Sequence, residues 1–169
     1  LQAHPMLCLY DAGALLLAGQ RTELAEARLR DSLSNGERAG LGGQMAVYQA
    51  LSATLQGRNA QSIMLAQRSL ELLPERSPFF RSMASLILAC DTLFTGDDEL
   101  AAQRLREALS LSDEVGNMMN SVLARTHLAE LAILHNRLAE AEILYREALD
   151  IATRSVEPEP VRGIPLMGY

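Results

Sequence analysis

Few residues in this sequence have the types and the spacing that metal binding or catalysis requires. His127 and Glu130 lie three positions apart, so on a helix they would share one face. A di-iron centre in a helical bundle needs two such pairs and further carboxylates. The sequence offers one pair of this kind, so we do not expect a metal site.

The other polar features of the sequence have structural explanations. Asp97, Asp98 and Glu99 form a run of carboxylates, and at the start of a helix they would cap free N–H groups and oppose the positive end of the dipole. All 15 basic residues are arginine, which excludes a Walker A phosphate loop and a Schiff-base lysine in this chain. No catalytic triad, nucleophile elbow or pair of buried carboxylates can be argued, so we do not expect an enzyme. Cys8 and Cys90 lie in apolar stretches and are expected to be buried thiols.

The composition predicts a helical, soluble protein. Hydrophobic residues make up 49% of the 169 residues and aromatic residues only 4%, so leucine and alanine, which favour helices, dominate the apolar content. The net charge of −6 disfavours a nucleic-acid surface, which is normally basic. Apolar runs are too short for the ~20 residues of a membrane span and no signal peptide is recognised, so we expect a cytoplasmic protein without membrane contact. Because the chain begins at Leu1 rather than Met, we expect it to be a fragment of a longer protein.

Turn residues divide the chain into helical segments. No stretch keeps the period of two that a strand requires, so no strands are expected. Thr22, Asn59, Ser77 and Asp97 are candidate N-caps. The predicted helices cover about residues 4–18, 22–33, 42–56, 59–73, 77–94, 97–115, 118–135 and 138–155.

A long sequence repeat runs through these helices. Arg-Glu-Ala-Leu occurs at Arg106–Leu109 and again at Arg146–Leu149. The turn residues within successive hairpins follow one another at nearly equal intervals, at Gly19, Gly57, Gly96 and Asn136. A period of roughly 40 residues indicates stacked helical hairpins.

Small residues recur at fixed distances from each turn, where they would let neighbouring helices approach closely. An alanine stands seven positions before each turn, at Ala12, Ala50, Ala89 and Ala129. Small residues stand five and twelve positions after the last three turns, at Ser62, Ser69, Ala101, Ala108, Ala141 and Ala148. Ala25 of the first hairpin is displaced by one position, and Leu105 and Tyr145 are expected to fill the space between the small residues.

The spacing of these alanines resembles the tetratricopeptide repeat (TPR), although the period here is longer than the period of that repeat. The segments HPMLCLYDAGALLLAGQ, LELLPERSPFFRSMASLILA and LAELAILHNRLAEAEILYREALDIA are similar to the MalT-like superhelical domain of large ATP-dependent LuxR-type bacterial transcriptional regulators. The resemblance spans residues 1–169 and implies an all-α fold, a right-handed superhelix (TPR-like α-solenoid) of about four antiparallel helix hairpins. The repeat domain would cover residues 1–157, and residues 158–169 would be a tail that starts a truncated further repeat. The expected hairpins are residues 4–34, 42–73, 77–115 and 118–155.

The resemblance also implies a function. In that family an N-terminal nucleotide-binding switch precedes a helical-repeat sensor and a C-terminal helix-turn-helix. This chain would be part of the sensor, with no cofactor of its own, and ATP and DNA would bind other domains of the parent protein. Its partner would be a small-molecule inducer or a regulatory protein. The alternative is a stand-alone TPR-like scaffold that binds proteins.

Solenoids expose a concave surface lined by the first helix of each hairpin, and this surface is the candidate binding groove. Counting from the turn residues, we expect the following residues to lie on or near this groove: Gln44, Tyr48, Thr54, Met83, Cys90, Thr126, His127 and Glu130. The competing interpretation is that these residues are partly packed or merely solvated.

Both ends of the sequence are apolar, which is unusual for an array that needs polar caps. The apolar residues concerned are Met6, Leu7 and Leu9 at the start and Ile164, Leu166, Met167 and Tyr169 at the end. Exposed apolar ends predict self-association.

Overall fold

The computed structural model describes residues 5–17, 23–30, 40–94 and 96–156, and the regular structure within these ranges is entirely helical. The helices are α1 (Pro5–Leu17), a helix over 23–30, α3 (Gly42–Leu55), α4 (Asn59–Leu72), α5 (Pro78–Thr92), α6 (Asp98–Glu114), α7 (Met118–Leu134) and α8 (Leu138–Val156). The sequence-based prediction of an all-α fold is therefore confirmed. None of the helices in these ranges is both long enough and apolar enough to cross a membrane.

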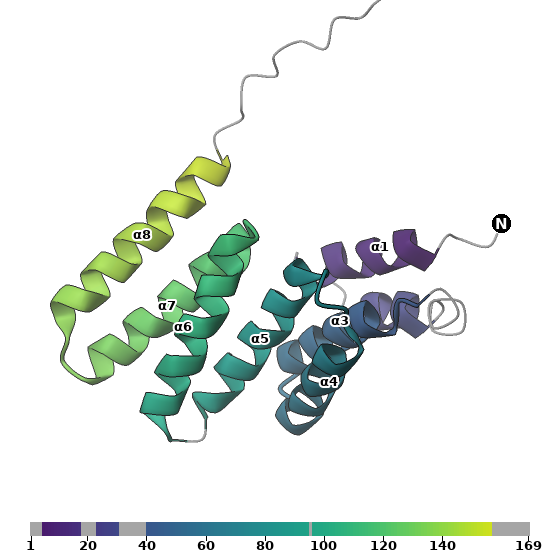
Figure 1. The fold of residues 1–169 in the computed structure, drawn as a ribbon, viewed down its shortest axis with the longest axis horizontal. Coiled ribbons are helices and arrows are strands. Elements are labelled where there is room, and N and C mark those ends of the chain that lie inside the picture. Colours follow the sequence, from purple (N-terminus) through teal and green to yellow (C-terminus); the bar gives the residue numbers. More distant parts are fainter. Residues whose placement is uncertain (1–4, 18–22, 31–39, 95, 157–169) are drawn as a thin grey trace, which may run out of the picture.

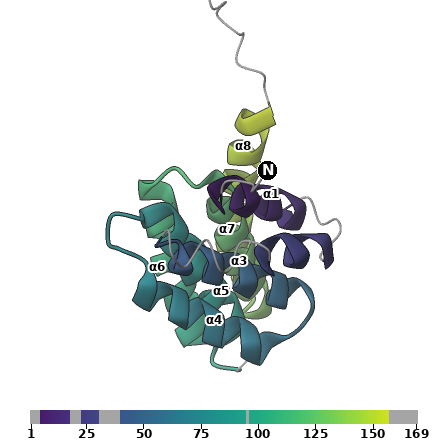
Figure 2. The same cartoon turned by 90° about the vertical axis from the view of Figure 1, so that its right-hand side faces the viewer.

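The helices stack as hairpins into an elongated array with α1 at one end and α8 at the other (Figure 1). Within each hairpin the two helices pack together, as α3 with α4, α5 with α6 and α7 with α8. The first helices of successive hairpins also contact one another, as α1 with α3, α3 with α5 and α5 with α7. Figure 2 looks along this stack from the end that carries α1. The array is an α-solenoid, because each hairpin buries its apolar face against its neighbours.

The turns inside the hairpins use left-handed backbone, as the turn residues predict. Gly57 has a φ of 70° and Gly96 a φ of 79°, and Asn136 reaches a φ of 57°. Asparagine tolerates this region better than other side-chain-bearing residues. Gly19 lies outside the described residues.

The small residues lie where helices cross, which confirms the prediction from their spacing. The alanines seven positions before each turn are 0% exposed, at Ala12, Ala50, Ala89 and Ala129. The small residues after the turns are at most 5% exposed, at Ser62, Ser69, Ala101, Ala108, Ala141 and Ala148. The prediction for Tyr145 is wrong: Leu105 is fully buried, but Tyr145 is 39% exposed. Among α1 and α3 to α8, only α7 contacts α8.

The N-cap residues of the helices agree only partly with those predicted from the sequence. The Asp97 carboxylate accepts a hydrogen bond from the Leu100 N–H at 3.0 Å and caps α6. The prediction for Asn59 is wrong, because Asn59 is the first residue inside α4 and Arg58 is the N-cap. Ser77 is the N-cap of α5, as predicted, with Pro78 after it, although its side chain accepts no capping hydrogen bond. Thr22 lies outside the described residues.

Arg125 joins three helices near the end of the array. Its guanidinium, on α7, donates two hydrogen bonds to the Asp113 carboxylate on α6, at 3.1 and 2.8 Å, and one to Glu147 on α8 at 3.1 Å. The Ser121 hydroxyl donates to the same Asp113 carboxylate at 2.6 Å. These donors, Arg125 first, hold the pKa of Asp113 below its usual value. The side chain of Arg125 is only 13% exposed, whereas those of Asp113 and Glu147 are 43% and 51% exposed, so only the guanidinium end of this bridge is shielded from water.

We predict that Ala101→Leu lowers the free energy of unfolding by about 1–3 kcal/mol, because the added carbons overpack the crossing of α6 with its neighbours. Ala101 is 0% exposed, so the larger side chain has no route to solvent. Chemical denaturation followed by circular dichroism measures the effect. Ala139→Leu on an exposed site of α8 is the matched control and should change little. Equal effects of the two substitutions would contradict the packing role of Ala101.

We also predict that Arg125→Ala lowers the free energy of unfolding at pH 7 by about 1–2 kcal/mol. The pKa of Asp113 is depressed in the folded protein, so its ionised form contributes stability above its unfolded pKa, and this contribution is lost as the pH falls through the folded pKa. The difference between wild type and variant should therefore shrink on acidification below about pH 4. Denaturation at several pH values tests this.

Arg146→Ala is the control for that experiment. Arg146 pairs with Glu142 within α8, and both side chains are largely exposed. Loss of this ion pair should change the free energy of unfolding little at any pH. If Arg125→Ala lowers the free energy of unfolding by the same amount at every pH, the role assigned to Asp113 is contradicted.

Candidate functional site

Two residues of the predicted groove belong to the hydrophobic core. Tyr48 is 5% exposed and Met83 is 7% exposed. The ring of Tyr48 packs edge-on against Phe80, with centroids 5.9 Å apart, and lies against α1 at Gly13. A Cβ on Gly13 would come within 2.6 Å of that ring, so the glycine provides the space that Tyr48 occupies.

Three other groove residues are half-buried polar side chains on the first helices of their hairpins. Gln44 lies near the start of α3. The Thr54 hydroxyl donates to the Ala50 carbonyl at 3.1 Å and lies 2.6 Å from the Ser62 hydroxyl, which links α3 to α4. The Thr126 hydroxyl donates to a carbonyl of its own helix at 2.9 Å. Both hydroxyls therefore have partners within the fold.

The remaining groove residues come together between α5 and α7. His127 Nδ1 lies 2.9 Å from a carboxylate oxygen of Glu130, which confirms that the two share a face of α7. Cys90 of α5 is half-buried, as Cys8 is, and burial together with the negative charges of Asp91 and Glu130 raises its pKa to about 12. A thiol with such a pKa stays protonated at neutral pH and is a poor nucleophile. In the part of the chain that the structure describes, no three histidine, cysteine or acidic side chains gather as metal ligands.

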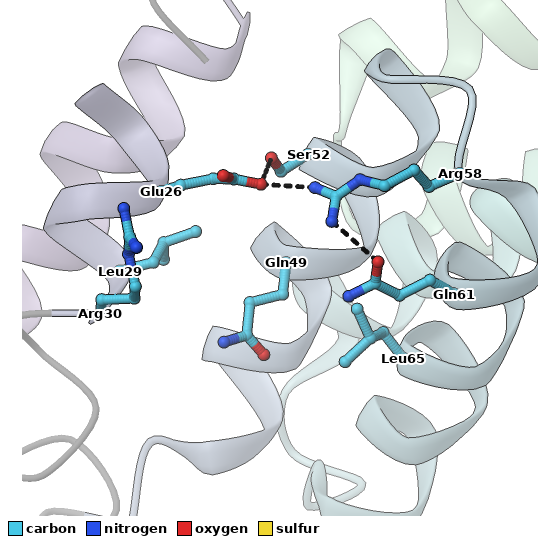
Figure 3. Close-up of a pocket in the computed structure, with 8 residues that line it drawn as sticks. All are labelled: Glu26, Leu29, Arg30, Gln49, Ser52, Arg58, Gln61 and Leu65. Atoms are coloured by element: carbon cyan, nitrogen blue, oxygen red, sulfur yellow. Dashed lines mark hydrogen bonds and ion pairs between the residues drawn. The ribbon is translucent and has the colours of Figure 1, made fainter. Parts of the chain in front are cut away.

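A pocket that sequence reasoning missed lies at the junction of the first two hairpins (Figure 3). It has a volume of about 300 Å³ and is formed by the helix over 23–30, α3 and α4. We call it the junction pocket. Its lining residues are Glu26, Leu29, Arg30, Gln49, Ser52, Arg58, Gln61 and Leu65.

A polar network ties the two hairpins together at one side of this pocket. The Glu26 carboxylate accepts hydrogen bonds from the Ser52 hydroxyl at 3.2 Å and from the Gln56 amide at 2.9 Å, and it forms an ion pair with Arg58. The guanidinium of Arg58 also donates to the Gln61 amide oxygen at 2.8 Å (Figure 3). The hydrogen bond from Gln56, followed by those from Arg58 and Ser52, lowers the pKa of Glu26. The carboxylate is therefore held ionised, and it fixes the position of one hairpin relative to the next.

The chemistry of the junction pocket suits a small molecule with several hydrogen-bonding groups. Arg30, Gln49 and Gln61 place charged and amide groups on its walls, and Leu29 and Leu65 supply apolar surface (Figure 3). Six of the eight lining side chains are polar and two are leucines, so the pocket suits a polar ligand better than an apolar one.

No sequence motif marks the junction pocket, because its residues come from three helices and have no characteristic spacing. Ser52 carries one usable signal. It is a polar residue that is 1% exposed among the buried residues of α3, most of which are apolar. Since a buried hydroxyl needs a hydrogen-bond partner, such a serine indicates a polar contact from a neighbouring helix.

Asp91 is the least well satisfied polar side chain among the described residues. It is 7% exposed on α5, and its Oδ2 atom has no hydrogen-bond partner in the part of the chain that the structure describes. Burial raises the pKa of this carboxyl. A raised folded pKa means that ionisation favours the unfolded state.

We predict that Asp91→Asn raises the free energy of unfolding at pH 7 by about 1–2 kcal/mol, because the buried charge is removed. In the wild type, stability should fall as the pH rises through the interval between the unfolded and the folded pKa of Asp91. The variant should lack this fall, and its advantage should vanish at pH values below that interval. Denaturation across this pH range measures the effect, with Asp150→Asn on exposed α8 as the control. Identical pH profiles of wild type and Asp91→Asn would contradict the prediction.

Comparison with known proteins identifies one family. The family described as the MalT-like TPR region matches residues 43–169, which is more than half of the chain and includes α4 to α8. Neither the curated proteins nor the solved structures gave a significant match. The predicted resemblance is thereby confirmed, and this chain belongs to the family of MalT-like TPR regions.

Proposed function

We propose that this chain is the ligand-sensing and interaction region of a LuxR-type transcriptional regulator, and that it couples binding to a switch domain outside residues 1–169. Membership of the MalT-like TPR family supports the assignment to a regulator of that type. The observation that carries the sensing role is the position of the junction pocket between two hairpins rather than within one.

A ligand in such a position can change the shape of the array. It would contact Arg30 on the helix over 23–30 as well as Gln49 on α3 and Gln61 on α4. A ligand shifts an equilibrium only if it binds one arrangement better than the other. Since the walls belong to separate hairpins, affinity depends on how these hairpins are placed relative to each other. Binding would therefore favour one curvature of the array.

The partner in this proposal is a small-molecule inducer or a regulatory protein that inserts a polar side chain into the junction pocket. ATP and DNA would bind other domains of the parent protein. The chain itself carries out no catalytic step and is cytoplasmic.

We predict that Gln49→Ala weakens binding of the inducer at least tenfold, because the substitution removes a hydrogen-bonding group from the pocket wall; a tenfold loss corresponds to about 1.4 kcal/mol. A thermal-shift screen of small metabolites against the parent protein would supply candidate inducers. Isothermal titration would then compare the dissociation constants of wild type and variant.

Gln103→Ala is the matched control for this titration, because Gln103 lies on the exposed side of α6, outside the junction pocket. Equal dissociation constants for wild type, Gln49→Ala and Gln103→Ala would refute the junction pocket as the binding site. Equal binding by the parent protein with and without residues 1–169 would refute the sensing role itself. The gene of the parent protein offers a separate test, since a stand-alone scaffold would lack a phosphate loop upstream and a helix-turn-helix downstream.

A further inference from the structure

The junction pocket contains one positive charge that nothing in the described part of the chain balances. Its charged lining residues are Glu26, Arg30 and Arg58. Glu26 and Arg58 form an ion pair, so their charges offset each other. Within the described ranges Arg30 has neither an ion-pair partner nor a hydrogen-bond acceptor, and no dashed line reaches it in Figure 3. With two arginines against one glutamate, the lining has a net charge of +1, although the chain as a whole has a net charge of −6.

A second lining side chain has unused hydrogen-bonding groups. Gln49 is half-buried on α3, and its amide has no hydrogen-bond partner in the ranges that the structure describes. A primary amide offers two N–H donors and an acceptor oxygen. Arg30 and Gln49 belong to different walls of the pocket, one on the helix over 23–30 and the other on α3 (Figure 3). A small molecule between these walls can therefore bond to both side chains at once.

The charges of the pocket match a ligand with a single negative charge. The N–H groups of a guanidinium form a fork that fits the two oxygens of a carboxylate, so Arg30 provides a place for one such group. Glu26 lies on the same pocket and is held ionised, because its hydrogen bonds lower its pKa. It repels any further negative charge. A phosphate monoester carries about −1.5 to −2 at pH 7, which is more than Arg30 alone can balance.

Arg58 is not available as a second cation for a ligand. Its guanidinium is paired with Glu26 and also donates a hydrogen bond to the Gln61 amide oxygen at 2.8 Å. If a ligand recruited Arg58, the ion pair that joins the helix over 23–30 to the α3–α4 hairpin would break. A dianion would therefore disrupt a contact between hairpins that a monoanion leaves intact.

We propose that the junction pocket binds a small monocarboxylate, whose carboxylate pairs with Arg30 and whose second polar group forms a hydrogen bond with Gln49. The volume of about 300 Å³ is at the lower end of the range of small-molecule sites, so the ligand is short. Leu29 and Leu65 provide apolar surface for its carbon atoms. This inference rests on the proposed function, because it names the class of ligand for the site proposed there.

A screen of matched compounds tests the ligand class. Thermal-shift measurements on the full-length protein that contains residues 1–169 would cover small monocarboxylates such as gluconate, N-acetylglycine and benzoate, each beside its uncharged carboxamide. Isothermal titration would then measure the dissociation constants of the best acid and of its carboxamide. We expect the acid to bind about tenfold more tightly, because the carboxamide has no charge for Arg30. Added salt should weaken binding of the acid but not of the carboxamide, since salt screens an exposed ion pair.

Substitutions at position 30 assign this preference to one residue. Arg30→Gln should remove the difference in affinity between the acid and its carboxamide, whereas Arg30→Lys should retain a preference for the acid because it keeps the charge. Arg28→Gln is the matched control, since it removes an arginine from the same helix. Arg28 pairs with Asp11 and does not line the pocket, so this variant should keep the full preference. Circular dichroism checks that each variant is folded.

The outcomes separate this inference from the proposed function. If a compound binds and Gln49→Ala weakens its binding, but Arg30→Gln does not, the proposed function stands and the monocarboxylate is refuted. The monocarboxylate is also refuted if no acid of the panel binds, or if uncharged compounds or phosphate esters such as glycerol 3-phosphate bind more tightly than every acid. If deletion of residues 1–169 leaves binding of the acid unchanged, the proposed function fails and this inference fails with it.

Discussion

The close approach of helices at small residues is the constraint on which the rest of this array depends. An alanine or serine at a crossing lets two helices touch along their backbones, and the surrounding leucines then fill the space on either side. Ala50, Ala89 and Ala129 perform this role in successive first helices, and each is fully buried. Because the crossings recur with the repeat, they place each hairpin on the one before it. They also bring the helix over 23–30 beside α3 and α4, so the junction pocket exists only while these contacts hold.

Much of this fold follows from the sequence, because turns and crossings depend on residue types that stand at regular intervals. Asn136 predicts a helix end because few residues tolerate its backbone conformation, and Ala101 predicts a crossing because few residues are small enough. The errors arose where a residue type permits several roles. Asn59 can cap a helix, but here it begins one. Tyr145 matches Leu105 in register, but its exposure depends on what lies over it, which the repeat pattern within one hairpin does not specify.

The candidate site was less predictable, because it depends on contacts between helices that are distant in sequence. Counting from the turns places Tyr48 and Met83 on the first helices correctly, yet it does not tell which way each side chain points, and both are in the core. The junction pocket rests on Glu26 meeting Ser52, 26 positions away, and Arg58, 32 positions away. Neither pair has a spacing that indicates contact. Only the packed arrangement of three helices brings these groups together.

The contacts between neighbouring hairpins bear on how proteins of this type can change in length over evolution. Each hairpin touches the ones beside it, and the crossings recur once in every repeat. Duplication or deletion of one whole repeat would lengthen or shorten the array without moving any alanine from its crossing. An insertion of one or two residues inside α5 would rotate Ala89 away from its neighbour, since each residue turns a helix by about 100°. Related arrays should therefore differ by entire repeats or within turns, and seldom within a helix.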